Sequence, residues 1–202
     1  MWGLVESGSI TKLINKPKGL VIGDVRHSRK IFELWSKSEL EAIGIYEVEY
    51  DNTNQKNETW YINTDQSFAF AGGKITASYG SATAKAHADT LFTAQDESNG
   101  LGTEGEVKAE GLKTVLIRDV KQQAAGELQN TDWYITRKAD AGTAVPSAIT
   151  NHRAAVRTKC AEMETAITNA ADTPALETLY TYTEQEDGSV TRPLGELPTL
   201  EV

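Results

Sequence analysis

Two long stretches of helical periodicity between Gly111 and Ala171 constrain the fold of this chain more than any other feature. In the second stretch, mostly apolar residues recur at steps of three and four: Ile149, His152, Val156, Cys160, Met163, Ile167 and Ala170. This spacing places them in one stripe along a single helix face. The stripe therefore predicts a helix that packs along its length against a second element.

The first stretch has a similar pattern, with steps of four: Leu112, Leu116, Val120, Ala124 and Leu128, widened by Val115 and Ile117. Helices of this length need tertiary cover, because intrinsic propensity alone leaves them marginal in water. We therefore expect an antiparallel helical hairpin. Its two helices are joined by residues 130–138, in which Thr131 can cap a short turn that carries Trp133 and Tyr134. The second helix begins at Pro146 or Ser147.

The N-terminal part alternates apolar and polar residues and is rich in turn signals. Ser7-Gly8-Ser9 and Gly72-Gly73 each separate two short apolar runs, which is typical of β-hairpins. Further strands are predicted at 20–22, 45–50 and 59–63. The spacing of Ser36 and Glu39 is that of a capping box, and it predicts one short helix from Lys37 to Ile43.

Residues 81–110 are dominated by Ala, Thr, Asp, Glu and Gly. This composition predicts a polar connecting arm, a linker or a partly disordered segment that contacts with a neighbouring molecule would order.

The expected fold class is α+β. A small antiparallel β-sheet domain spans 1–80, the arm 81–110, the helical hairpin domain 111–180 and an extended tail 181–202. A short helix opens after Asp172, and Asp187-Gly188 predicts a hairpin in the tail.

Composition restricts the classes of function. A net charge of −9 with scattered Lys and Arg argues against nucleic-acid binding. No apolar run is long enough to span a membrane, and no secretory signal opens the sequence, so we expect assembly in the cytosol. Aromatic residues make up 7% of the chain, and the mean hydropathy is −0.42. A core this thin favours burial completed by another subunit.

The sequence contains no signature of catalysis, of a cofactor or of a metal site. His27, His87 and His152 lie far apart, without Cys or carboxylate companions at ligand spacing. The glycines between Gly100 and Gly105 follow no strand, so a phosphate-binding loop is not expected. The single cysteine, Cys160, excludes an internal disulfide, and its place on the stripe favours a buried apolar role. His152 is expected to be a hydrogen-bonded core histidine.

The residues predicted to act are therefore interface residues. Trp133 and Tyr134 either close the end of the hairpin or anchor a partner, because Trp and Tyr dominate interface energetics. Arg153 and Arg157 lie one helical turn apart, and each is either solvated or paired with a carboxylate on the facing helix or on another subunit. The apolar stripe of the second helix supplies four more candidates: Ile149, Val156, Met163 and Ile167.

The segment Thr131-Asp-Trp-Tyr-Ile-Thr-Arg-Lys138, followed by Gly142, Pro146 and the helix from Arg153 to Arg157, resembles the C-terminal module of tail-fibre assembly proteins and of small tail or baseplate-associated proteins of tailed bacteriophages. The N-terminal patterns resemble the opening module of marine phage proteins of this kind: residues 2–6, 31–32, 35–36, 39–45, 51–53 and 66–70.

This resemblance implies a structural component of the virion tail, in the tail-fibre or baseplate attachment region. It would be assembled in the host cytoplasm and would contact other tail proteins or the tail fibre in several copies. The alternative is a tail-fibre assembly chaperone that binds the fibre tip. Neither role implies catalytic residues, and an enzyme is not expected.

Overall fold

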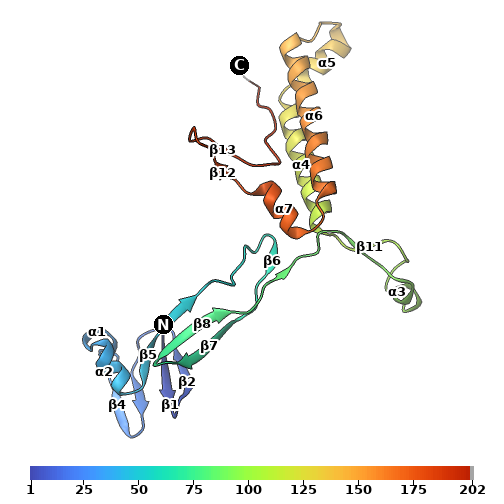
Figure 1. Ribbon diagram of the computed structural model, residues 1–202. Coiled ribbons are helices and arrows are strands. Elements are labelled where there is room, and N and C mark those ends of the chain that lie inside the picture. Colours follow the sequence, from blue (N-terminus) through green and yellow to red (C-terminus); the bar gives the residue numbers. More distant parts are fainter. Residues whose placement is uncertain (201–202) are drawn as a thin grey trace. The chain divides into compact units, whose positions relative to one another are not determined.

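The computed structural model describes residues 1–200 (Figure 1). The chain divides into two compact units, Met1–Thr83 and a second that begins at Ala84. The first unit is mainly sheet and the second mainly helix, which confirms the predicted α+β class.

The first unit is built around one five-stranded sheet in the order β2-β1-β5-β8-β7. Its elements are β1 (Trp2–Glu6), β2 (Ser9–Ile14), β3 (Leu20–Ile22), β4 (Val25–His27), α1 (Ile31–Leu34), α2 (Lys37–Ala42), β5 (Ile45–Asp51), β6 (Tyr61–Ile62), β7 (Gln66–Ala71) and β8 (Lys74–Tyr79). Strand β9 (Thr83–Ala84) lies at the boundary of the two units.

The predicted hairpins β1–β2 and β7–β8 are both present, and β3, β5 and α2 lie close to their predicted positions. Ser36 and Glu39 form the expected capping box at the start of α2. After α2, Gly44 adopts a φ of +80°, and a Cβ there would come within 2.6 Å of the Val5 carbonyl oxygen. Only glycine fits this tight return from α2 into β5.

Three details of the first unit differ from the prediction. The sheet is mixed and not purely antiparallel, because β5 and β8 pair in parallel, with Val48 opposite Ile75. Between β5 and β8 the chain forms β7, the edge strand, which is antiparallel to β8. The chain therefore enters β8 in the same direction as β5. A second short helix, α1, precedes α2, and the strand predicted at 59–63 is reduced to Tyr61–Ile62.

The core of the first unit has two clusters. One joins β1, β2 and β5 to the two short helices through buried apolar residues: Leu4, Ile14, Leu20, Ile31, Leu40 and Ile45. The other centres on Val48, Ile75 and Ala77. Gly3 in β1 leaves room for the Ile75 side chain, with which any side chain at position 3 would collide.

The second unit is organised by two long antiparallel helices that lie side by side in Figure 1. Its elements are β10 (Thr90–Leu91), α3 (Ala94–Ser98), β11 (Val107–Ala109), α4 (Leu112–Gln129), α5 (Asp132–Ala141), α6 (Ser147–Asn169), α7 (Thr173–Tyr180), β12 (Thr183–Glu184) and β13 (Val190–Thr191). The hairpin of α4 and α6 and the start of α6 agree with the prediction. So do α7 and the tail hairpin β12–β13. The prediction for residues 201–202, the end of the tail, lies outside the described residues.

At one end of the hairpin, the start of α4 is fixed by the segment before it. Asp89 accepts hydrogen bonds from the Gly111 amide (2.7 Å) and the Thr114 hydroxyl (2.8 Å). The Lys113 ammonium donates to the carbonyl of Thr168 in the last turn of α6 (2.8 Å). A cation at that place satisfies a carbonyl that the helix itself leaves without a partner.

The opposite end of the hairpin is fixed by Arg153. Its side chain is buried, and Nη1 donates to the Leu128 carbonyl at the end of α4 (2.7 Å) and to the Thr131 hydroxyl (2.6 Å). The same nitrogen lies 2.8 Å from Oδ1 of Asp132 at the start of α5. One guanidinium thus joins three helices.

This arrangement replaces the predicted short turn. Residues 132–141 form a ten-residue helix, α5, and the Thr131 side chain makes no cap to it. The Thr131 hydroxyl instead donates to Leu128 O and accepts from Arg153. A partner 22 residues away in sequence therefore overrides the local capping preference.

Replacing Arg153 with Ala should lower the free energy of unfolding by about 2–3 kcal/mol, because a buried hydroxyl and a helix-terminal carbonyl each lose a charged donor. The matched control is Arg157→Ala. Arg157 is exposed and makes one long bond, 3.4 Å, to a carbonyl of its own helix, so its loss should cost less than about 1 kcal/mol. Urea unfolding followed by circular dichroism measures both. Equal effects would contradict the assigned role of Arg153.

Candidate functional site

An exposed aromatic cluster lies on α5. The rings of Trp133 and Tyr134 are 3.8 Å apart between centroids, with an interplanar angle of 32°. The guanidinium carbon of Arg137 lies 4.6 Å from the Trp133 centroid and 5.4 Å from that of Tyr134. Trp133 is 51% exposed, and the neighbouring Ile135 is 44% exposed. We call Trp133, Tyr134 and Arg137 the α5 cluster.

The α5 cluster is held on a fixed support. Arg153 positions the start of α5, and Gly142 ends the helix in a left-handed conformation, its amide donating to the carbonyl of Lys138. Nε of Arg137 is covered and has no hydrogen-bond partner among residues 1–200. The cluster therefore offers a partner two aromatic rings with a guanidinium beside them, which suits apolar groups and carboxylates together.

The other predicted interface residues on α6 have a different role. Ile149, Val156, Met163 and Ile167 are all buried inside the second unit, where α6 packs on α4. Their stripe is covered by the chain itself, so the expectation that they face a partner is corrected. Arg153 is likewise internal. Arg157 is exposed and makes no ion pair among the described residues.

Two further residues of the α6 stripe, Cys160 and His152, have polar or ionisable side chains. Cys160 is buried as predicted, and burial, reinforced by its contact with Glu164, raises the pKa of the thiol. A raised pKa disfavours the reactive thiolate. His152 is also buried, but its Nε2 has no hydrogen-bond partner in the described part of the chain. His152 is thus a core residue as predicted, but among the described residues the predicted hydrogen bond is absent at Nε2.

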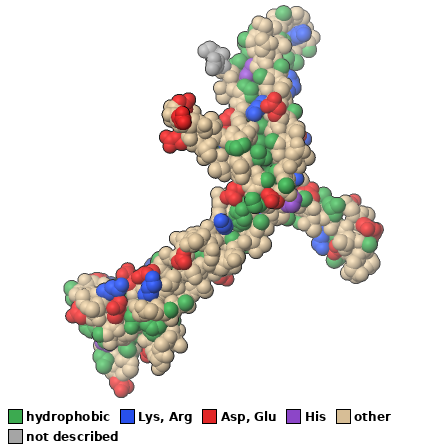
Figure 2. All heavy atoms as spheres, in the orientation of Figure 1, with side chains coloured by type: hydrophobic (Ala, Val, Ile, Leu, Met, Phe, Trp, Pro, Cys, Tyr) green, Lys and Arg blue, Asp and Glu red, His purple; other side chains and the backbone are tan. Residues whose placement is uncertain are grey.

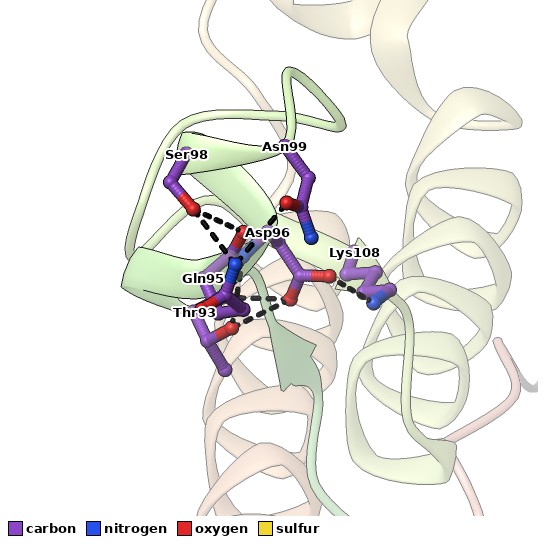
Figure 3. A network of polar contacts seen from close by, with 6 residues as sticks. All are labelled: Thr93, Gln95, Asp96, Ser98, Asn99 and Lys108. Carbon is purple, nitrogen blue, oxygen red and sulfur yellow. Dashed lines mark hydrogen bonds and ion pairs between the residues drawn. The ribbon is translucent and has the colours of Figure 1, made fainter.

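The predicted polar arm is an ordered element with its own hydrogen-bond network. Strands β10 and β11 pair, and α3 lies between them (Figure 1). Figure 3 shows the network around Asp96, whose carboxylate accepts from the Thr93 amide (3.0 Å) and pairs with the Lys108 ammonium (2.8 Å). The Gln95 amide donates to Ser98 and Asn99. The predicted arm therefore has secondary structure and side-chain contacts of its own.

The outer surface of the arm remains apolar in part. Leu91 and Val107 face each other across the ribbon, and they are 47% and 49% exposed. Leu101 is 60% exposed. The opposite face is closed by Phe92, which packs where a side chain at Gly102 would collide with it. The arm is a second exposed surface on the helical unit.

A third surface, a pocket, belongs to the first unit, and the sequence pattern did not predict it. A pocket of about 270 Å³ is lined by side chains from β1, α1, α2 and β5: Trp2, Phe32, Trp35, Lys37, Leu40, Ile45 and Glu47. The only local sequence feature that points to this pocket is the aromatic pair Phe32 and Trp35, which precedes the capping box. The other walls come from strands that meet only in the folded sheet.

Carboxylates also gather along the groove between α4 and the C-terminal tail, where Glu127 and Glu196 are lining residues. Glu196 is already engaged, since it accepts from the Tyr182 hydroxyl (2.6 Å) and pairs with Arg192 (2.8 Å). Arg192 in turn lies over the rings of Tyr180 and Tyr182. Most of these contacts lie within the tail, and the contact of Arg192 with Tyr180 joins the tail to the end of α7.

The chain matches no family model, no curated protein and no solved structure. Within residues 1–200, no cluster of three or more His, Cys, Asp or Glu side chains has the arrangement of a metal site. Within the same range, no helix combines the length and apolar character needed to cross a membrane.

The Asp96 network predicts how the arm responds to acid. Three hydrogen bonds, led by that of Lys108, lower the pKa of Asp96 from 3.8 to about 2. A lowered carboxyl pKa stabilises the folded arm above pH 3.8, and this contribution is lost as the pH falls toward 2. Asp96→Asn should remove the ion pair at neutral pH and make amide hydrogen exchange in residues 93–108 several-fold faster.

The control for this experiment is Asp140→Asn, which removes one exposed negative charge at the end of α5. Exchange in the arm should not change in this variant. Equal protection in wild type and Asp96→Asn would show that the network of Figure 3 does not hold the arm.

Proposed function

We propose that this chain is a structural component of a phage virion tail, in the tail-fibre or baseplate attachment region, and that it acts through protein–protein contacts. Its partners are other tail proteins or the tail fibre, and several copies are assembled in the host cytoplasm. The observation that carries the proposal is the α5 cluster. It lies in the segment Thr131–Lys138, which resembles part of the C-terminal module of phage tail proteins.

The physical character of the cluster supports a docking role. Trp, Tyr and Arg are the residues in which interface binding energy is concentrated. A half-exposed Trp that is stacked on a Tyr and an Arg has little side-chain entropy left to lose when a partner binds. The buried guanidinium of Arg153 fixes α5 on the long helices, so the surface is formed before binding.

One observation favours the alternative, a tail-fibre assembly chaperone that binds the fibre tip. The α5 cluster belongs to the segment that resembles tail-fibre assembly proteins, and a small exposed cluster of this kind suits a partner that is later released. Mass spectrometry of purified particles distinguishes the two roles. A structural protein is present at a fixed copy number, whereas absence from mature particles would favour the chaperone.

Trp133→Ala should weaken co-assembly with the partner by on the order of 2 kcal/mol, or about 30-fold in affinity, because it removes the centre of the cluster. Co-purification of full-length chain with tail proteins from infected cells, followed by titration, measures this. The variant should keep its circular dichroism spectrum and unfolding midpoint, since the Trp133 side chain is half exposed.

The matched control is Tyr50→Ala in the first unit, which removes an aromatic side chain of similar exposure, 53%. Its affinity should equal that of the wild type. Unchanged binding by Trp133→Ala would contradict the docking role, and an unfolded Trp133→Ala variant would make the residue part of the core.

A further inference from the structure

The arm contains one pair of residues with a reactive sequence. Asn99 is the only asparagine of the chain that is followed by glycine. This order favours spontaneous deamidation, because glycine has no side chain to hinder its nitrogen as that nitrogen approaches the asparagine side chain. Asn99 and Gly100 are both exposed, at the point where α3 ends. The pair therefore combines a reactive sequence with access to water.

The folded arm holds the two reacting groups of this pair apart. At Asn99 ψ is 0°, so the Gly100 nitrogen is eclipsed with the nitrogen of Asn99 and not with its Cβ, as closure of a five-membered ring requires. The Gly100 amide also donates to the carbonyl of Glu97 (2.9 Å), which retains its proton. Figure 3 shows the Asn99 side chain turned toward α3, where Oδ1 accepts from Nε2 of Gln95 (3.1 Å). Attack requires this turn to open.

The turn is closed by the same network that holds α3. Gly100 has a φ of +71°, and the next amide, that of Leu101, donates to the Asp96 carbonyl (3.0 Å). These bonds form the paired pattern with which a left-handed glycine ends a helix. The Asp96 carboxylate accepts from the Thr93 amide at the start of α3 and pairs with Lys108 on β11. Loss of these contacts would therefore release both ends of α3.

We propose that Asn99 is a site of deamidation and that opening of the arm around α3 sets its rate. In the open arm, hydroxide removes the Gly100 amide proton, and the nitrogen forms a bond to Cγ of Asn99. The bond from Cγ to the side-chain nitrogen breaks, and that nitrogen leaves as ammonia with a proton from water. Water then opens the succinimide ring at either carbonyl, which gives an aspartyl or an isoaspartyl residue. The inference does not depend on the phage-tail assignment.

Both products change the arm. Each adds a carboxylate beside the last carbonyls of α3, where a negative charge is unfavourable. Glu97, Glu104 and Glu106 are exposed in the same arm, and Figure 2 shows acidic side chains on its surface. The isoaspartyl product also adds a CH₂ group to the main chain, which displaces the Leu101 amide from the Asp96 carbonyl. Deamidation therefore loosens the end of α3 and the exposed apolar residue that follows it.

Peptide mapping by mass spectrometry tests the site. The full-length chain would be incubated at mildly alkaline pH and digested at acidic pH, so that digestion adds no deamidation. The peptide with Asn99 should gain aspartyl and isoaspartyl forms, and enzymatic methylation of isoaspartyl residues identifies the second. Asn52 is the internal control, because it is exposed but followed by Thr53. Its peptide should remain unmodified over the same period.

Comparison of folded and unfolded chain tests the control by the arm. The chain in urea should deamidate at Asn99 faster than the folded chain. The ratio of the two rates should be similar to the protection of the Gly100 amide against hydrogen exchange, because both reactions need local opening and loss of the same proton. Asp96→Asn removes the ion pair with Lys108 and should make deamidation of the folded chain several-fold faster. Asp140→Asn, an exposed residue on α5, should leave the rate unchanged.

Three outcomes would overturn the proposal. One is an Asn99 that stays intact in the folded chain over a period in which the chain in urea is converted. Another is an equal rate in the folded chain and in urea, or in wild type and Asp96→Asn, which would show that the network does not control the reaction. The third concerns Asn99→Asp, which carries the new charge from the start. Amide exchange in residues 93–108 should be faster in this variant, and unchanged exchange would contradict the effect on the arm.

Discussion

The geometry of the helical unit depends on one buried cation. Arg153 brings together the Leu128 carbonyl in the last turn of α4, the hydroxyl of Thr131 and the carboxylate of Asp132 at the start of α5. Burying a guanidinium costs several kcal/mol unless its donors are used, so the interaction selects one arrangement of three helices more than it adds stability. α5 and its aromatic residues face outward in a fixed direction because this network closes the end of the α4–α6 hairpin.

The core beneath that network is complete within a single chain. The stripe of α6 meets α4, and Val156 and Ile167 are fully buried there. The thin aromatic content therefore does not require a second subunit to cover this stripe. Apolar side chains that the fold leaves exposed include Trp133 in the α5 cluster and Leu91, Val107 and Leu101 in the arm, and we propose that docking uses such side chains. Together they support an account in which the chain acts by contact.

The sequence predicted those elements whose signals are local. The capping box of Ser36 and Glu39, the Gly72-Gly73 hairpin and the stripe of α6 each depend on residues within a few positions, and each is present. Features that depend on distant residues were missed. Thr131 does not cap α5, because Arg153 occupies its hydroxyl. The parallel pairing of β5 and β8 and the pocket around Trp2 both arise from the order of strands in the sheet. Sequence patterns identified the α5 cluster but could not separate it from the buried stripe.

Hydroxyl-radical footprinting, read by mass spectrometry, tests most directly whether this chain works through the surfaces that its fold exposes. The isolated full-length chain would be compared with the same chain in its assembled complex. Trp133 should be oxidised in the isolated chain and protected in the assembly, while Met163, which is 1% exposed, should be protected in both. Equal oxidation of Trp133 in the two samples, or a labelled Met163 that becomes protected only on assembly, would contradict the account.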